Sequence, residues 1–552
     1  MAKTPPPKSV TITYDLFDLP TAQHKAGLAG LLLQIDSMRN RNIPAPCVVS
    51  RSATQATIEF TEATVQSLFN DVYAAEEVEI RSKTKWSGAE LLREEEVEEE
   101  IEGKKKKVRH YFYRAIQPTL PLLRQYLKYP EWLKLWRDML WAIPRGNPQS
   151  REPFEQRVKG ITCKEGMGAW SHLVKVHAAQ MKNTLFTATV AGSLWLGAQA
   201  TNAELVDFEG RAEQNLLLHF WPLTSLVYVP QVVKPDGSSE LVGYVLAIPE
   251  VSNLDGFLVD YPLLLGGLGG QLRGYRPAES VIDLPAQAAL SFLEHLARFS
   301  SDIVTTSELR YSISAAEYMH LAKFGNNIKT MASGRISPRP YLREEYLAIV
   351  GRPGDKAPYN APLFRSGLMY AFLEERSWFE PFAKLLIEWP AEFFVRSESP
   401  NNLPWFWVDA QKKFEEVNQV MPTDSQPGDQ LPDEDSILST LLYRLTSRYL
   451  RECAKDKSGI DPEEYKSGEK IDWKQVPPAF NEARRALAAR LFLEFRSRRD
   501  QAFVSHFAAT FFAVKQFLDQ EQYAEIGRAL LRRTDDVKTL TLMALSANSL
   551  PF

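Results

Sequence analysis

The chain has 552 residues, of which 44% are hydrophobic and 24% are charged, and its formal net charge is −4. This composition excludes a disordered chain, and the length exceeds the roughly 250–300 residues at which one hydrophobic core stops growing, so we expect two or three domains. The slightly acidic balance argues against a nucleic-acid binder but leaves local basic patches open.

The cysteine content and the hydropathy of the chain indicate the cellular compartment in which we expect the protein. Cys47, Cys163 and Cys453 lie far apart and are odd in number, so neither a disulfide framework nor a zinc knuckle follows. The first ten residues lack the apolar core of a signal peptide, and no segment approaches the roughly 18–20 apolar residues of a membrane span. We therefore expect a cytoplasmic protein with reduced cysteines and no membrane contact.

The N-terminal region predicts the element order β-α-β-β-α-β. Thr21 is placed to cap the first helix. This order is that of the ferredoxin-like fold, which RNA-recognition domains share with many unrelated proteins, so it gives no function by itself. The predicted strands are Val10–Leu16, Cys47–Ser50, Thr57–Phe60 and Val78–Ser82, and the predicted helices are Ala22–Met38 and Glu62–Tyr73.

A charged insertion over residues 83–114 follows. Glu94–Glu102 is almost entirely acidic, Lys104–Lys107 is entirely basic, and Gly103 lies between them. This pattern predicts a hairpin whose arms pair Glu with Lys across the strands. The basic arm continues into Val108–Arg114, where aromatic and basic residues mix, and both a nucleic-acid surface and a solvated arm are open there.

The whole pattern predicts an α+β protein. Residues 1–117 form an N-terminal α+β part, and residues 118–420 form a mixed α/β to helical body that contains a hairpin at Leu223–Ile248. Met421–Asp435 is a proline-rich acidic linker. Residues 436–552 have the periodicity of four or five helices, which predicts a separate all-α bundle.

Known enzyme motifs are absent from the sequence. There is no P-loop and no Gly-x-Ser-x-Gly elbow, and His172 and His177 lack the glutamate of the zinc-protease helix. The glycine-rich run 266–276 has Leu272 where a dinucleotide fingerprint needs glycine. We therefore expect no enzyme activity, no metal and no cofactor. An enzyme with an unrecognised site stays open, because carboxylates distant in sequence can meet in space.

Arginines concentrate on the predicted C-terminal helices. Residues 481–499 carry six arginines against two glutamates, and Arg444, Arg448 and Arg451 add a further cluster. Arg484 projects onto the apolar stripe, but near the helix start, where we expect its head to reach water. A groove lined by these arginines would hold single-stranded nucleic acid without reading its sequence. The alternative is an ordinary helical bundle whose arginines are simply exposed to solvent. The predicted backbone-contacting residues are Arg145, Asn147, Arg151, Arg484, Arg485, Arg496, Arg498, Arg499, Arg528 and Arg532.

Two loops combine glycines with side chains that read base edges. Glycine lets a backbone approach a groove closely, and Asn, Gln, Lys and Arg hydrogen-bond to base edges. Tight turns with polar surface residues also explain both loops, and this is the more common reason for such a pattern. The motif-reading candidates are Gln271, Arg273 and Arg276 in the glycine-rich run, and Asn326, Asn327 and Lys329 in the second loop.

Two segments resemble a known family. Tyr14–Leu33 reads YDLFDLPTAQHKAGLAGLLL and is similar to the N-terminus of the large subunit of type I CRISPR Cascade complexes of the MYXAN subtype. Ile143–Arg157 resembles a second segment of that family. The resemblance implies recognition of the protospacer-adjacent motif beside the target, help in unwinding target DNA, contact with the 5′ end of the guide crRNA, and no catalysis. It also implies that the C-terminal bundle is similar to the complex's small subunit.

The resemblance implies a set of partners. These are crRNA, target double-stranded DNA, the Cascade backbone and 5′-handle subunits, and a recruited helicase-nuclease or transposition adaptor. Guide pairing would read the target sequence, while protein reads a short motif and backbone shape. The competing class is a structural subunit of another nucleic-acid assembly.

Met421 is a candidate internal start for a separate small subunit. It precedes a polar tail, and the codons of Glu415, Glu416 and Val417 are able to spell a purine-rich ribosome-binding sequence. The alternative is a chance methionine in an interdomain linker.

Overall fold

The structure is a computed structural model, and it describes residues 7–86, 90–101, 104–128, 151–190, 194–195, 208–270, 277–299, 312–325, 327–352, 354–395, 406–419, 433–467, 470–473, 475–513 and 517–549. The chain divides into two compact units. Unit 1 comprises residues 1–231 and 241–343, and unit 2 comprises residues 232–240 and 344–552. Small sheets lie in the N-terminal half and helices dominate the C-terminal region, so the predicted α+β class is confirmed.

The N-terminal elements follow the predicted order, but the sheet differs from a complete ferredoxin-like one. The sheet has three antiparallel strands in the order β1-β3-β2. β4 is not part of this sheet and pairs with β6 instead. Thr21 caps the first helix by accepting from the backbone N–H of His24, as predicted. The elements are β1 (Val10–Asp15), α1 (Ala22–Asn40), β2 (Cys47–Arg51), β3 (Gln55–Phe60), α2 (Glu62–Val72) and β4 (Ala75–Ser82).

Helix α1 forms the centre of unit 1, and two glycines let the following chain lie directly against it. A Cβ at Gly27 would stand 2.2 Å from the carbonyl oxygen of Leu217, and one at Gly30 would stand 2.3 Å from that of Phe220. These close approaches seat α8 (Ala212–Leu217) and the short helix η2 (Trp221–Thr224) on α1. Any larger residue at either position would force the two segments apart.

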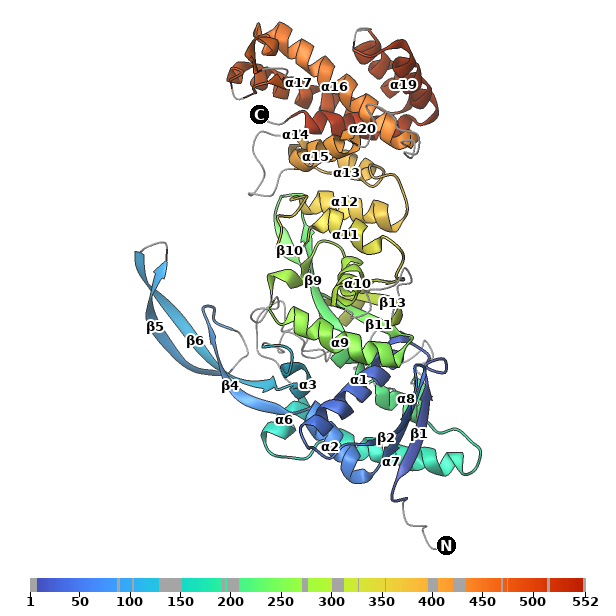
Figure 1. Ribbon diagram of the computed structural model, residues 1–552. Coiled ribbons are helices and arrows are strands. Elements are labelled where there is room, and N and C mark those ends of the chain that lie inside the picture. The colour runs from blue at the N-terminus through green and yellow to red at the C-terminus, as the bar shows by residue number, and fades with distance from the viewer. Residues whose placement is uncertain are drawn as a thin grey trace. The chain divides into compact units, whose positions relative to one another are not determined.

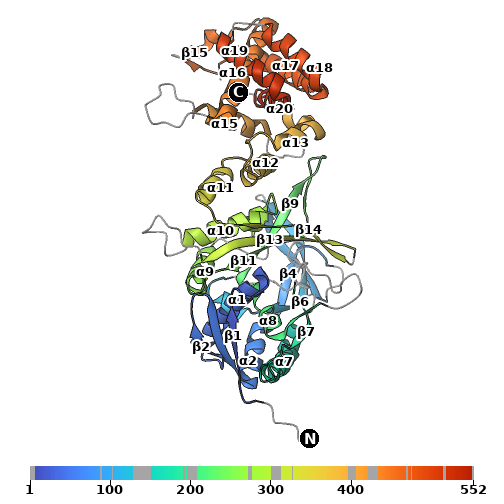
Figure 2. The ribbon, with the colours of Figure 1, turned by 90° about the vertical axis from the view of Figure 1, so that its right-hand side faces the viewer.

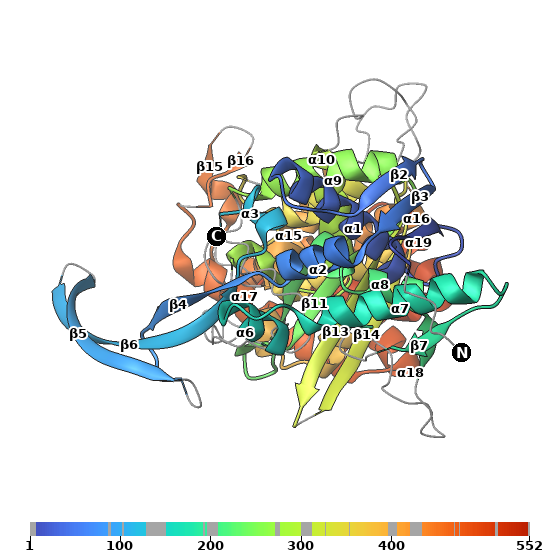
Figure 3. The ribbon, with the colours of Figure 1, turned by 90° about the horizontal axis from the view of Figure 1, so that it is seen from below.

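The charged insertion forms the predicted hairpin. β5 (Leu91–Ile101) and β6 (Lys104–Pro118) are antiparallel, and Glu98 lies opposite Lys107. β4 extends along β6 only as far as the pair Ser82 and Tyr111. The ribbon therefore has two strands at its outer end, and Figures 1 and 3 show it standing away from the rest of unit 1.

A larger sheet has the strand order β10-β9-β11-β13-β14, and β12 also pairs with β9. The predicted hairpin at residues 223–248 corresponds to β9 through β11. Helix α10 (Gln287–Phe299) packs on β11, β13 and β14, and β13 with β14 forms a long hairpin (Figure 2). The strands are β9 (Leu226–Val233), β10 (Ser239–Leu241), β11 (Tyr244–Val251), β12 (Val281–Ile282), β13 (Ile313–Phe324) and β14 (Asn327–Ile336).

Remaining elements of unit 1 join these sheets. They are α3 (Pro121–Arg124), α6 (Glu152–Val158), α7 (Lys164–Gln180), β7 (Thr187–Thr189), β8 (Glu209–Arg211), α9 (Leu254–Leu268) and η3 (Ala278–Ser280). α7 packs on α2 and α8, and α9 packs on α10 and α1.

Unit 2 is mostly helical and is organised around α20 (Thr534–Ala547), which is buried along nearly its whole length. α15, α16 and α17 all pack on it. The other elements are α11 (Leu342–Val350), α12 (Pro362–Leu373), α13 (Phe382–Glu388), α14 (Glu392–Val395), α15 (Phe406–Gln419), α16 (Glu434–Ser458), η6 (Pro462–Tyr465), β15 (Lys466–Ser467), β16 (Lys470–Ile471), α17 (Pro478–Ser497), α18 (Asp500–Phe507), η7 (Ala508–Phe512) and α19 (Gln520–Arg532).

Helices on both sides of residues 421–435 share one core. Phe394 of α14 stacks on Phe492 of α17 with ring centroids 5.7 Å apart, and Phe414 of α15 stacks on Tyr443 of α16 at 4.6 Å. The division between the two units falls at residues 343 and 344. The domain boundaries expected at residues 117, 420 and 435 stay predictions.

Among the described residues, no helix has the length and apolar character that crossing a membrane requires.

Candidate nucleic-acid interface

Several predicted site residues fall outside the described residues: Arg145, Asn147, Gln271, Arg273, Arg276, Asn326 and Met421. The side chain of Asn327 does as well. Lys329, Arg151 and the C-terminal arginines are described.

Arg484 is buried and serves the core of unit 2. Its side chain is 5% exposed, and its Nε and Nη2 donate to the carbonyl oxygen of Asn548 over 3.2 and 3.1 Å. The guanidinium also lies 5.9 Å from the ring of Trp473, and burial lowers its pKa to about 10. The expectation that its head reaches water is therefore wrong, because the C-terminal end of the chain and Trp473 cover the start of α17.

Three neighbouring arginines are half-buried and donate to backbone carbonyls. Arg485 donates to Asn481 over 3.3 Å, Arg496 donates from Nε to Ile387 over 3.1 Å, and Arg498 donates to Glu494. Burial lowers the pKa of Arg496. A guanidinium has five N–H donors, so these groups keep donors in reserve, but each is already held by the fold.

The exposed cations are the ones free to meet phosphate. Within the described residues, the guanidinium groups of Arg444, Arg499 and Arg532 have no ion-pair or hydrogen-bond partner. Arg528 pairs with Glu525, but both side chains are largely exposed, and such a pair contributes only about 0–1 kcal/mol. These four arginines can therefore exchange water or a weak partner for phosphate at low cost.

The β13–β14 hairpin carries a second basic surface at its turn. Phe324 ends β13 with its side chain 48% exposed, and Nζ of Lys329 lies 5.5 Å from the centre of its ring. Lys323 is also exposed, and Gly325 has a φ of +59°, a left-handed conformation that favours glycine. An exposed aromatic ring beside a lysine can stack on a base while the cation meets a phosphate. Phe324 was not predicted from the sequence, although its place beside the turn glycine was visible there.

An ion cluster fixes the base of this hairpin. Glu250 of β11 accepts from Nζ of Lys25 over 2.8 Å and from Nε of Arg335 over 2.7 Å. Burial raises the pKa of Glu250, but the two cations outweigh it and hold that pKa below its usual value. Burial and the nearby Glu250 raise the pKa of Glu317, which lies opposite Arg335 in the sheet. The hairpin is thus tied to α1 and β11.

Comparison with models of protein families assigns the chain to a family. Residues 45–304 match the family model described as the Type I-B CRISPR Cas8b N-terminal domain, and residues 313–548 match the Type I-B CRISPR Cas8b C-terminal domain. Together the matches span nearly the whole chain.

The chain belongs to the Cas8b family.

It is therefore a large subunit of a type I CRISPR Cascade complex, as the sequence resemblance predicted. Cas8b large subunits are structural components of Cascade in CRISPR defence. The comparison with curated proteins gave no match. The boundary between the two Cas8b domains falls just before β13, so the β13–β14 hairpin begins the C-terminal domain.

In this Cas8b chain, Arg151 is part of unit 1. It is the N-cap residue of α6, and its guanidinium is 5.8 Å from the ring of Tyr73. One terminal nitrogen, Nη1, is buried and has no hydrogen-bond partner among the described residues. Because this nitrogen is buried, it is not open to a phosphate in the described part of the chain.

The cations described in the charged hairpin of this Cas8b chain are largely paired. Arg109 pairs with Glu96 at 3.0 Å and Lys85 with Glu94 at 3.3 Å, while Arg93 pairs with Glu79 and Glu95. A phosphate backbone would have to compete with these carboxylates. The solvated arm is therefore the better of the two interpretations for the described part of the ribbon.

No group of three or more His, Cys, Asp or Glu among the described residues is arranged to hold a metal ion.

Proposed function

We propose that this large subunit recognises the protospacer-adjacent motif of target DNA, helps to separate its strands, and contacts the 5′ end of the crRNA within Cascade. The observation that carries the proposal is the turn of the β13–β14 hairpin, where Nζ of Lys329 lies 5.5 Å from the centre of the exposed Phe324 ring and Lys323, the residue before Phe324, is also exposed. The partners in this role are crRNA, target double-stranded DNA and the backbone and 5′-handle subunits. We also propose that this large subunit belongs to a Cascade complex of the MYXAN subtype.

The turn supplies two kinds of contact that opening a duplex requires. Lys323 and Lys329 bind phosphates and thereby fix the position of the duplex. These phosphate contacts do not read the base sequence. The ring of Phe324 stacks on a base that loses its partner, and such stacking contributes about 1–3 kcal/mol per base. Asn326 and Asn327 follow Gly325 in the sequence and are proposed to read base edges, as are Gln271, Arg273 and Arg276 of the glycine-rich run.

The exposed arginines of unit 2 bind strands without reading them. Arg499, Arg528 and Arg532 carry this role, with Arg444 of α16 added, because these are exposed and unpaired or weakly paired. Arg485, Arg496 and Arg498 contribute less, since backbone carbonyls already hold them. Arg484 is withdrawn from the set. Arg145, Asn147 and Arg151 are proposed as backbone contacts on the N-terminal side.

A separate small subunit starting at Met421 is also proposed. It would contain α16 to α20 but lack α14 and α15, which cover Phe492 and Tyr443 in the full chain. We expect such a fragment to be stable only where another protein surface covers these rings.

The test of strand separation uses the assembled complex with Phe324→Ala and, as the matched control, Met331→Ala. Met331 lies on β14 and is also 48% exposed. Phe324→Ala should weaken binding to intact duplex about tenfold and leave binding to a duplex with a pre-melted target segment nearly unchanged. The Met331→Ala complex should resemble wild type with both substrates. Equal losses on both substrates would contradict a role of Phe324 in opening the duplex.

A further inference from the structure

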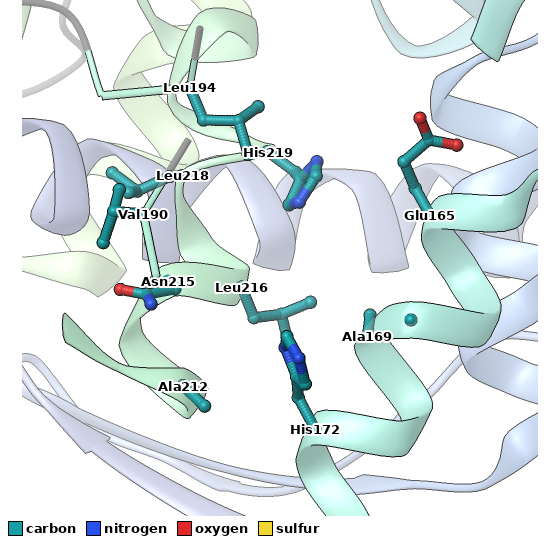
Figure 4. Close-up of a pocket in the computed structure, with 11 residues that line it drawn as sticks. Glu165, Ala169, His172, Val190, Leu194, Ala212, Asn215, Leu216, Leu218 and His219 are labelled. Atoms are coloured by element: carbon teal, nitrogen blue, oxygen red, sulfur yellow. The ribbon is translucent and has the colours of Figure 1, made fainter. Parts of the chain in front are cut away.

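Unit 1 contains a cavity of about 170 Å³ between α7 and the segment that includes α8. Glu165, Ala169 and His172 line it from α7, and Figure 4 shows His219 and Leu194 on another wall. The α7 residues are spaced three or four apart, so they share one face of the helix. Gly168 lies on that face too, and no atom stands within 4 Å of the position its Cβ would take. The small residues of α7 therefore leave this space open.

The walls of the cavity are mostly apolar, with a few polar groups. Val190, Leu194, Leu216 and Leu218 supply apolar surface. Nδ2 of Asn215 donates to the carbonyl oxygens of Ala188 and Gly210, whereas its Oδ1 is buried and has no hydrogen-bond partner among the described residues. A site of this kind, apolar with few polar groups, is typical of small-ligand binding in proteins.

Besides the Asn215 amide, the polar side chains of the cavity are a carboxylate and two imidazoles. Glu165 accepts a hydrogen bond from the thiol of Cys163, with Sγ and Oε2 2.9 Å apart. Nδ1 of His219 lies 3.0 Å from the hydroxyl oxygen of Tyr73. Burial, aided by Arg151, lowers the pKa of His219 to about 3, and burial also lowers the pKa of His172. Both imidazoles are thus neutral at neutral pH.

These groups exclude some ligands and favour others. A phosphate or carboxylate would meet the Glu165 carboxylate and find no cation among the lining residues. An engineered apolar cavity of about 150 Å³ binds benzene, so this volume suits one aromatic ring. Neutral His172 offers both a donor and an acceptor, His219 offers only the ring nitrogen that Tyr73 does not engage, and the Glu165 carboxylate offers acceptors. The fitting ligand is an uncharged heterocycle of one ring that bears an amino group.

We propose that this cavity binds a single pyrimidine base, cytosine, extruded from a single-stranded nucleic acid. A carboxylate accepts well from the N4 amino group of cytosine, whereas uracil presents a carbonyl oxygen at that place and would be repelled. The proposal rests on the proposed function, because it assigns one base-specific contact to a chain that otherwise binds strands through their backbone. Extrusion of a base from a single strand requires little energy, since no base pair is broken.

A cation stands close to the cavity for the adjoining phosphate. Lys175 lies three residues beyond His172 on α7 and is exposed, and its Nζ is 5.4 Å from the ring of Phe186. Phe186 in turn contacts His172, with ring centroids 6.0 Å apart. A base in the cavity thus has an exposed lysine and an aromatic ring beside it, the combination that single-strand sites use.

The test uses the full chain and two RNA probes of about eight nucleotides, oligo(C) and oligo(U), in fluorescence anisotropy. Gly168→Leu fills the cavity from α7. Gly527→Leu is the matched control, because Gly527 is a helical glycine of α19 that also has no atom within 4 Å of its Cβ position. Both changes raise helix propensity similarly, so a difference between them reports the cavity.

Wild type and Gly527→Leu should bind oligo(C) about tenfold more tightly than oligo(U), and Gly168→Leu should bind both probes equally. Glu165→Gln should shift the preference toward oligo(U), since its amide can donate to the uracil carbonyl. The salt dependence should stay the same in all four proteins, because it counts phosphate contacts.

A wild-type chain without preference for oligo(C), or a Gly168→Leu chain that keeps it, would overturn the proposal. Neither result would touch the arginines of unit 2, whose removal lowers affinity for both probes alike. Failure of the cavity and failure of the general strand-binding role are therefore distinguishable. A thermal melt of Gly168→Leu confirms that the variant is folded, and Glu165→Gln provides a second test that does not depend on filling the cavity.

Discussion

Nε of Arg335 donates to Oε2 of Glu250 over 2.7 Å, and this contact ties β14 to β11 at the base of the proposed duplex-contacting hairpin. Lys25 of α1 donates to the other carboxylate oxygen. The hairpin is thus held at its base by charge, while its turn carries the exposed groups. A rigid base lets contacts at the turn be positioned reproducibly.

Glu250→Gln should loosen the hairpin. The cations hold the pKa of Glu250 below its usual value, so its contribution to folding is present above about pH 4.3 and is lost as the pH falls through the lowered folded-state pKa. At pH 7 the substitution should cost about 1 kcal/mol, because Arg335 is partly exposed. Hydrogen exchange of the β14 amides should accelerate accordingly. Unchanged exchange at pH 7 would show that the ion cluster does not stabilise the hairpin.

Arg484→Ala should destabilise unit 2 and leave strand binding alone. The substitution deprives the buried carbonyl of Asn548 of two hydrogen bonds, which should cost about 1–3 kcal/mol. Arg490→Ala is the control, since Arg490 lies on the same helix, is exposed, and pairs with Glu494 within that helix. The free energy of unfolding in urea and the DNA affinity, both measured for each variant, distinguish a loss of stability from a loss of strand binding. Reduced affinity of a fully folded Arg484→Ala complex would return Arg484 to the interface.

Removing Arg499, Arg528 and Arg532 should weaken binding of the complex to all target sequences by the same factor. For a single strand, each phosphate that no longer meets an arginine should reduce the slope of log affinity against log salt by about 0.7. The control replaces Arg93, whose guanidinium is engaged by Glu79 and Glu95. A weakening confined to particular sequences, or an unchanged salt slope, would argue against phosphate binding by these arginines.

Changing Met421 to a non-start codon, with silent recoding of codons 415–417, should remove a free fragment of residues 421–552 from the purified complex. Recoding alone should reduce the fragment and leave the full-length chain unaffected. The readout is intact-mass spectrometry. Detection of only the full-length chain in the unaltered complex would exclude an internal start.

Local patterns in the sequence predicted local structure well. The run of glutamates facing a run of lysines across Gly103 was sufficient for the β5–β6 hairpin, because both partners lie within a short stretch. The same kind of pattern did not show that β4 leaves the first sheet, since its partner β6 follows a long insertion. Pairing between strands that are distant in sequence depends on how they pack in the fold, and the local periodicity of the sequence does not reveal it.

The candidate site was harder to predict for the same reason. Arginine content located the basic helices, but the partners that occupy Arg484 and Arg496 lie 64 and 109 residues away in sequence. Helical projection places a side chain on a face and does not reveal what covers that face. The cavity beside His219 likewise joins residues of α7 to those after α8, which the scattered histidines did not suggest.

The most direct test of the account measures how the assembled complex discriminates duplexes with and without the flanking motif. Asn326, Asn327 and Lys329 are replaced together by alanine, and Lys384, an exposed lysine in α13 that pairs with Glu388, is replaced as a control. We expect the triple variant to lose most of this discrimination and the control variant to keep it. A triple variant with unchanged motif preference would contradict the assignment of the β13–β14 turn to motif recognition.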